Sequence, residues 1–166
     1  MYQLERVRAD HEAAILDFEV VNRAYFTQSI NDRGDDYFAN FSREHRALLN
    51  EQATGAFAFH VLVDEHGAVV GRFNLFDIVE HSANVGYRVA ERVTGRGVAS
   101  AGLRQLCQLA RDEYGLRTLR AATSDENVAS QRVLEKAGFV VDGPTDVAGR
   151  PGRSYELDLT NFEANP

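Results

Sequence analysis

A short segment with two glycines, set between a strand pattern and a helix pattern, is the feature that most limits how this 166-residue chain folds. Segment 92–99 reads RVTGRGVA and follows an apolar strand pattern at 85–89. Gly95 and Gly97 are free to adopt positive φ angles and let the main chain approach another group closely. Free N–H groups at the start of a helix, together with the helix dipole, bind anions. The segment therefore predicts an anion-binding loop where strand and helix meet.

Two known phosphate loops do not match this segment. The dinucleotide fingerprint needs a third glycine three residues after Gly97, and Ser100 stands there. The nucleotide P-loop needs Gly-Lys-Ser or Gly-Lys-Thr, which is absent. A Gly-x-Gly pair before a helix is also common as a tight turn, so the segment alone leaves the function open.

The remaining pattern predicts one mixed α/β domain over residues 1–166. Alternating apolar residues at 57–63 and 68–76, separated by a polar turn, indicate an antiparallel hairpin. Polar stretches at 31–35 and 80–84 indicate loops. In chain order, we expect a strand at 3–8, helices at 10–18 (N-cap Asp10) and 36–52, strands at 57–63, 68–76 and 85–89, a helix from 98 to about 114, a strand at 119–123, a helix at 127–137 capped by Gly138, a strand at 139–141, a turn at Gly143 and Pro144, and a strand at 155–159.

Charge and hydropathy exclude several classes of partner. The formal net charge is −7, from 25 acidic and 18 basic residues, which argues against nucleic acid because phosphate binding needs a cationic surface. No apolar run reaches the length of a membrane span. The first residues carry mixed charge and do not resemble a signal peptide. We therefore expect a cytoplasmic protein with no membrane partner.

Cysteine and histidine content argues against disulfides and metals. The single cysteine, Cys107, excludes an internal disulfide framework and a cysteine zinc cluster, and its place on an apolar helix face predicts an inert core residue. His11, His45, His60 and His66 show no metal-binding spacing, so no metal is expected.

Two sequence blocks together resemble a known family. Arg92-x-x-Gly95-x-Gly97 resembles the Gln/Arg-x-x-Gly-x-Gly/Ala signature of the GCN5-related N-acetyltransferases (GNAT). The blocks 127–130 (NVAS) and 133–139 (VLEKAGF), with the strand 84–87 (NVGY), are similar to those of the subgroup that acetylates bacterial ribosomal proteins at their N-termini (RimJ/RimL-like). The resemblance covers residues 57–159 well, and the first fifty residues only by the order of their elements.

The resemblance implies a GNAT fold with acetyl-CoA as co-substrate and no metal. This α/β (α+β) fold has a mixed central sheet that is flanked by helices and splayed around acetyl-CoA. The strand 85–89 would hold the thioester carbonyl by main-chain N–H groups, which stabilise the transition state strongly in a dry site. The pantetheine arm would lie between this strand and the strand 119–123, which splay apart. The residues expected to bind the coenzyme are Tyr87, Val89, Arg92, Thr94, Gly95, Arg96, Gly97, Val98, Ala99, Asn127 and Ser130.

Catalytic residues are less clearly indicated. Ser130 would donate a proton or hydrogen bond to the leaving sulfur, since Leu134 stands where many relatives have a tyrosine. The alternative is that Asn127 only caps a helix and Ser130 only fills its polar face. Asn84 stands where the subgroup often has a glutamate base.

The nearby substitutes for that base are Asp77, Glu80 and His81. Among them, His81 has the most suitable ordinary pKa, about 6.5, although a histidine in a polar loop is more often solvated than catalytic. Tyr155 is expected to line the acceptor site or, alternatively, to pack in the core or at an edge of the sheet. Arg23, Tyr25, Phe26 and the loop 31–35 are expected to shape it.

The missing glutamate favours an acceptor with an α-amino group. Such an amine, with a pKa of about 8, is roughly one-tenth neutral at pH 7, whereas a lysine-like amine with a pKa of about 10.4 is almost wholly charged. We expect direct N-acetylation of a peptide N-terminus or an amino-acid-like small molecule by a monomer or homodimer. The alternatives are a non-catalytic module that binds acyl-CoA and a nucleotide-binding protein.

Overall fold

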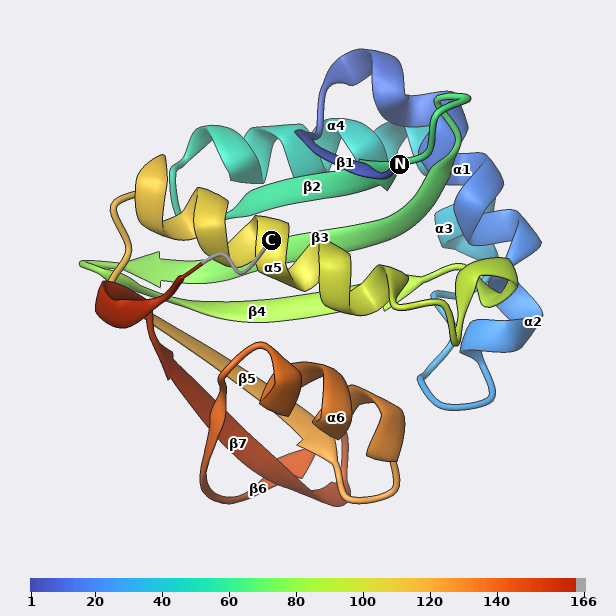
Figure 1. Ribbon diagram of the computed structural model, residues 1–166. Helices are drawn as coiled ribbons and strands as arrows, with labels where there is room; N and C mark the ends of the chain where they lie inside the picture. The colour runs from blue at the N-terminus through green and yellow to red at the C-terminus, as the bar shows by residue number, and fades with distance from the viewer. Residues whose placement is uncertain (164–166) are drawn as a thin grey trace.

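The computed structural model describes residues 1–163 and contains one seven-stranded sheet in the order β1-β2-β3-β4-β5-β7-β6 (Figure 1). All neighbouring strands are antiparallel except β4 and β5, which are parallel. This is the mixed sheet that the sequence predicts. The strands are β1 (Gln3–Arg6), β2 (Ala58–Val63), β3 (Val69–Val79), β4 (Ser82–Val89), β5 (Thr118–Ser124), β6 (Val140–Val147) and β7 (Arg150–Asp158).

Helices flank the sheet on both sides (Figure 1). One side carries α5 and α6, and α1 and α4 lie on the other side, over β2 and β3. The helices are α1 (Glu12–Val21), α2 (Arg23–Phe26), α3 (Asp35–Ala39), α4 (Phe41–Ala53), α5 (Val98–Asp112) and α6 (Val128–Lys136), with 3-10 turns at Ala9–His11, Glu91–Val93 and Leu159–Asn161.

Close packing of α5 on β3 depends on a glycine. Gly102 faces the buried ring of Phe73, and a Cβ atom at Gly102 would lie 2.3 Å from that ring. The Phe73 ring in turn stacks on the ring of Tyr87 in β4, at a centroid distance of 5.5 Å and an angle of 12°. The helix, the sheet and Tyr87 are thereby packed as one unit.

The sheet splits between β4 and β5. The two strands pair only from Ser82–Thr118 to Asn84–Arg120. Beyond Asn84, β4 continues its pairing with β3, and β5 pairs with β7 over its whole length. From Val85 onward the facing edges of β4 and β5 therefore diverge, as the resemblance implies.

Three local expectations near the N-terminal half are wrong. The helix expected at 36–52 is broken at Asn40, which has φ −119° and ψ 37° and separates α3 from α4. The N-cap of α1 is His11 instead of Asp10, because the His11 ring accepts the N–H of Arg8 at 2.9 Å. The loop expected at 80–84 is a tight turn, and β4 already begins at Ser82.

The turn expected at Gly143 and Pro144 is also wrong. Both residues lie within β6, where the pairing register with β7 shifts between Val141 and Gly143. Proline is tolerated here because β6 is an edge strand and its unpaired side needs no N–H donor. The hairpin turns instead at Ala148 and Gly149, both at positive φ.

Candidate active site

The glycine loop is built as its residues predict. Gly95 and Gly97 have φ angles of 74° and 76°, and Gly97 is the N-cap of α5. A Cβ atom on either glycine would meet no atom within 4 Å. Buried Val93 and Val98 anchor the loop on its two sides. The N–H groups of the first turn of α5 therefore open toward free space.

A cleft of about 370 Å³ begins at this loop and continues between β4 and α6; we call it the loop cleft. Its lining is mainly small and apolar. It is lined by Tyr25, Tyr87, Arg88, Val89, Val93, Thr94, Gly95, Gly97, Val98, Ala99, Ser100, Asn127, Ala129, Ser130 and Val133.

A second cleft of about 390 Å³, the split cleft, lies where β4 and β5 diverge. The segment 29–31 and the tip of the β6–β7 hairpin complete its wall. It is lined by Ser29, Ile30, Asn31, Val85, Gly86, Tyr87, Ala121, Ala122, Thr123, Ser124, Asn127, Ser130, Leu134, Val147, Ala148 and Arg150.

The two clefts share three residues, Tyr87, Asn127 and Ser130, which we call the junction. The Tyr87 hydroxyl and Ser130 Oγ are 3.0 Å apart and hydrogen-bonded across the split. Asn127 Oδ1 accepts the N–H of Ser130 at 3.1 Å and so caps α6. Burial raises the pKa of Tyr87 above its ordinary value, which keeps its hydroxyl protonated at neutral pH. The junction therefore offers two hydroxyl groups where the clefts meet.

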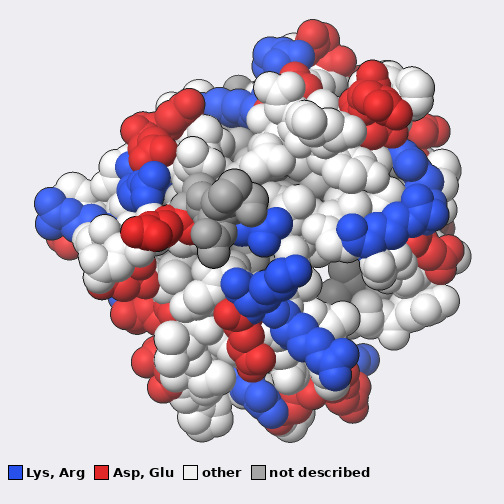
Figure 2. Space-filling view, in the orientation of Figure 1, with Lys and Arg blue, Asp and Glu red and all other residues white. Residues whose placement is uncertain are grey.

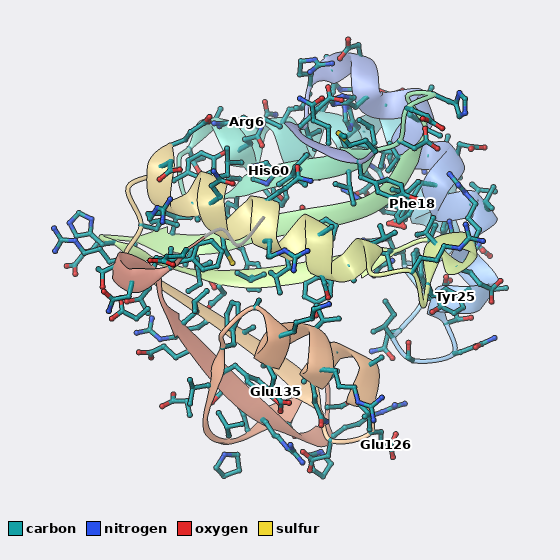
Figure 3. The ribbon with its side chains drawn as sticks, viewed as in Figure 1. Arg6, Phe18, Tyr25, His60, Glu126 and Glu135 are labelled. Carbon is teal, nitrogen blue, oxygen red and sulfur yellow. The ribbon has the colours of Figure 1, made fainter. Side chains whose placement is uncertain are left out.

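Within residues 1–163, no aspartate or glutamate lines the split cleft. Its one charged lining residue is Arg150, whose nearest acid is Glu126 at 3.7 Å. Glu126 belongs to the loop before α6 (Figure 3) and its side chain is 85% exposed. The ion pair is weak for this reason, and the Arg150 guanidinium remains able to take another partner.

Most of the expected coenzyme-binding residues line the loop cleft. The exceptions are Arg92 and Arg96, which are exposed and do not line it. The Arg92 side chain points to Asp64 instead, at 3.4 Å. Arg96 was expected from its charge beside the glycines and Arg92 from its charge and its place in the signature, and neither fixes the direction of a long side chain.

The structure brings Ser130 into the site but not the other expected catalytic residues. Glu80 and His81 form the exposed turn between β3 and β4 and line neither cleft. Tyr87 lies six residues further along β4, about 20 Å away at the rise of an extended strand. The proposal of Glu80 or His81 as the base therefore does not fit this geometry.

Tyr155 also lies outside both clefts. It is 1% exposed, pairs with Ala121 in the sheet, and its hydroxyl has no hydrogen-bond partner among residues 1–163. Asp77 accepts a hydrogen bond from Asn84 at 3.3 Å but lines neither cleft. The clefts therefore contain no carboxylate or imidazole base from the expected set.

Only some of the residues expected to shape the acceptor site line a cleft. Arg23 binds Asp32 and Asp35 at 2.7 and 2.8 Å and so ties down the loop 31–35. Tyr25 of α2 (Figure 3) lines the loop cleft, and Phe26 is buried. Of the loop itself, Asn31 lines the split cleft.

No sequence signal indicates that Ser29, Ile30 and Arg150 line the split cleft, and they come from segments far apart in the chain. Residues 121–123, which also line it, belong to the strand expected to face the strand 85–89 across the split. Ala148 and Gly149 next to Arg150 are a turn signal that would have located the hairpin tip. No local signal places that tip beside β4.

Other expectations concern metals, membranes and the cysteine. In the described part of the chain, no three His, Cys, Asp or Glu side chains group closely enough to hold a metal ion. Over the same residues, no helix combines the length and apolarity that a membrane crossing requires. Cys107 is fully buried in the core, as expected, and burial raises its pKa to about 12.

Solved structures share this fold. The ribosomal-protein-S5-alanine acetyltransferase of Vibrio fischeri superposes with a TM-score of 0.88 at 18% identity, over 98% of this chain and 95% of that one. RimJ of Mycobacterium smegmatis, solved with CoA-disulfide, gives 0.86 at 22% identity, over 98% and 85%. A spermidine/spermine N-acetyltransferase of Vibrio cholerae gives 0.76 at 16% identity, over 98% and 97%. At these low sequence identities, the similarity shows only that the fold is shared.

Sequence comparisons point the same way. The probable N-acetyltransferase YjcK of Bacillus subtilis is 27% identical over 128 residues, which cover 74% of this chain and 71% of that protein. The model of the acetyltransferase (GNAT) domain matches residues 3–140, which include β4, the glycine loop and α6. The chain belongs to the GNAT acetyltransferase family.

Proposed function

We propose that the protein transfers the acetyl group of acetyl-CoA to an α-amino group, either at a protein N-terminus or on an amino-acid-like small molecule. The observation that carries this proposal is the junction, where the Tyr87–Ser130 pair joins the loop cleft to the split cleft. A thioester carrier in one cleft and an amine in the other would meet there.

The loop cleft fits the parts of coenzyme A. The open space at Gly95 and Gly97 and the first N–H groups of α5 suit its pyrophosphate. The apolar walls, including Val89, Val98 and Val133, suit the pantetheine arm. This placement differs from the one that the resemblance implies, between the strands 85–89 and 119–123. Figure 2 shows Lys and Arg side chains interspersed with Asp and Glu over the face on which α5 and α6 lie. The basic side chains among them are available to a polyanionic coenzyme.

The junction supplies the proton-handling groups. When bound, acetyl-CoA supplies the activated acyl group. Ser130 Oγ would donate a hydrogen bond to the leaving sulfur, and the Tyr87 hydroxyl would hold Ser130 in place. The C–S bond breaks as the C–N bond forms, and the proton that the amine loses balances the proton that the thiolate takes up. The edge of β4 beyond Asn84 has no strand partner on the β5 side. Its main-chain N–H groups on that side would polarise the carbonyl.

The lining of the split cleft supports an α-amine over a polyamine. With no carboxylate in its wall, the cleft gives an ammonium group no charge partner and gives the amine no strong base. An α-amine needs little help, since roughly one-tenth of it is neutral at pH 7. A polyamine would also be repelled by Arg150.

The test compares acceptors of similar size at several pH values. We expect kcat/KM for a short peptide with a free N-terminus to rise with pH and level off near the amine pKa of about 8. Spermidine at pH 7 should be slower by at least about a hundredfold, reflecting its smaller neutral fraction. Coenzyme release with spermidine as fast as with the peptide contradicts the α-amine assignment. Tight coenzyme A binding with no turnover on any amine supports a non-catalytic module instead.

A further inference from the structure

On the sheet face opposite α5, three arginines surround one buried carboxylate. Glu19 of α1 is 1% exposed, and its oxygens accept from Arg33 at 2.9 Å, Arg72 at 3.1 Å and Arg88 at 3.4 Å. The Arg72 side chain is only 5% exposed. Arg33 and Arg88 are 34% and 20% exposed, so Arg72 is the guanidinium that is held away from water. A buried charge of this kind is costly unless each of its donors has a partner.

A cavity of about 200 Å³, the α4 cavity, lies directly beside Arg72, between α4 and the strands β2 and β3. Its walls combine aromatic and charged side chains. It is lined by Arg33, Tyr37, Phe41, Glu44, His45, Ala47, Leu48, Glu51, Phe59 and Arg72. None of these residues lines the loop cleft or the split cleft, so this space is separate from the proposed acetyl-transfer site.

Two buried polar atoms of this lining have no partner among residues 1–163: Arg72 Nε and His45 Nδ1. Arg72 Nη1 already donates hydrogen bonds to Glu19 and to the Tyr37 hydroxyl, so Nε–H remains as a free donor. His45 Nε2 lies 3.0 Å from the carbonyl of Arg8 and donates to it, and its Nδ1 has no partner. Buried groups of this kind normally have partners. Their lack of one indicates that the cavity holds something polar.

The side chains of the lining indicate which class of molecule the cavity binds. A carboxylate satisfies the free Arg72 donor with a charge-assisted hydrogen bond. Phe41 and Phe59 provide an apolar surface for the rest of the molecule. Glu44 and Glu51, the two acids of the lining, oppose large polyanions such as nucleotides. We propose that the α4 cavity binds a small organic monocarboxylate, with its carboxylate on Arg72 and its apolar part against Phe41 and Phe59.

Benzoate and its neutral analogue benzamide test this proposal by isothermal titration calorimetry on the whole chain without coenzyme. Benzoate should bind saturably at one site. Benzamide should bind at least about tenfold more weakly, because it lacks the charge-assisted hydrogen bond to Arg72. Ala47→Phe places a ring in the cavity from an exposed position of α4 and should abolish binding. Asn50→Phe, which puts the same ring on an exposed α4 position outside the lining, should leave it unchanged.

Three results would overturn the proposal: no saturable benzoate binding, equal binding of benzamide, or full binding by Ala47→Phe. The last result would place benzoate elsewhere, for example at Arg150. If Ala47→Phe does not fold, as judged by circular dichroism, Arg72→Lys decides the question. This variant keeps the positive charge beside Glu19 but removes the Nε–H donor, and it should weaken benzoate binding by about tenfold. Unchanged affinity in Arg72→Lys would also overturn the proposal.

Discussion

The two parts of the sheet on either side of the split are packed differently. Strands β2 and β3 are buried on both faces for much of their length, between α5 on one side and α1 and α4 on the other. In β5, buried residues alternate with exposed ones such as Arg120, and in β6 the side chains of Val140 and Val141 are 70% and 49% exposed. The strands β5, β7 and β6 are therefore covered by a helix on one face only.

Because of this difference, we expect the β4 side and the β5 side of the split to respond differently to substitution. The β4 side is fixed by packing through Gly102, Phe73 and Tyr87. The β5 side, which carries Ser130, is joined to β4 by three strand pairs and by the Tyr87–Ser130 hydrogen bond. We expect changes in the first part to cost stability, and changes at the clefts to cost binding or catalysis with little loss of stability. The four predictions below test this division.

The largest expected effect is at Gly97. In Gly97→Val, the new side chain would occupy the open space at the start of α5 and block the pyrophosphate from two or more N–H groups. Each charge-assisted hydrogen bond is worth about 2 kcal/mol, so the affinity for coenzyme A should fall by roughly a thousandfold. Calorimetric titration of coenzyme A measures this.

The control for this variant is Gly67→Val. Gly67 lies in the turn between β2 and β3 with φ 79°, a Cβ atom there would also meet no atom within 4 Å, and the residue lines neither cleft. It should suffer the same backbone strain and keep its affinity for coenzyme A. Equal loss in both variants, or none in either, contradicts a pyrophosphate site at Gly97.

The next effect is a pH dependence of stability at His60, which is buried between α5 and the sheet (Figure 3). Burial lowers its pKa from 6.5 to about 4 in the folded chain. At pH values between 4 and 6.5, His60 is protonated in the unfolded chain but not in the folded chain. The free energy of unfolding therefore falls as the pH drops from 6.5 to about 4. The loss due to His60 should reach about 3 kcal/mol.

Urea unfolding of the wild type and of His60→Gln at pH 7 and at pH 4 isolates this contribution. The variant cannot take up the proton, so its free energy of unfolding should fall less on acidification. Parallel losses in the two proteins would show that His60 is not the group responsible, and that the β4 side is less tightly closed than its burial indicates.

Gly102→Ala should have a smaller effect on stability. The added methyl group would overlap the Phe73 ring, which has no free space because it is fully buried. Overpacking of this kind costs about 2 kcal/mol. Chemical denaturation measures the change, and Ala99→Gly at the start of the same helix controls for helix propensity. A stability equal to that of the wild type would mean that α5 moves freely on β3.

Ser130→Ala should have the smallest effect, and it concerns catalysis alone. Loss of one hydrogen-bond donor to the leaving sulfur should lower kcat by about tenfold or somewhat more. The affinity for coenzyme A and the free energy of unfolding should stay close to those of the wild type, because Asn127 still caps α6. An undiminished kcat would remove Ser130 from the chemistry and leave it as a lining residue of the junction.

The loop cleft was largely predictable from the sequence, because its main features are local. Gly95 and Gly97 can take positive φ because they have no side chain. Asn127 caps the helix that directly follows it. These residues also lie close together along the chain in two short blocks. The two expected residues that do not line it, Arg92 and Arg96, have long side chains, and that of Arg92 points to the distant Asp64.

The split cleft was not predictable in the same way. Its base candidates, Glu80 and His81, lie near Tyr87 in sequence, but an extended strand carries them to the far end of β4. The residues that do line it, such as Ile30 and Arg150, come from opposite ends of the chain. Only the pairing of β7 with β5 and the course of the segment after α2 bring them together.

The sequence by itself determined the order of strands and helices, the conformation of the glycine loop and the family, because periodicity, glycine conformation and capping act over a few residues. Tertiary structure alone decided which hydroxyl groups meet at the junction, that no carboxylate from residues 1–163 lines the split cleft, and that Glu19 gathers three arginines beside a cavity. Contacts of this kind join residues tens of positions apart. They follow from the free energy of packing the whole sheet, which no short stretch of sequence contains.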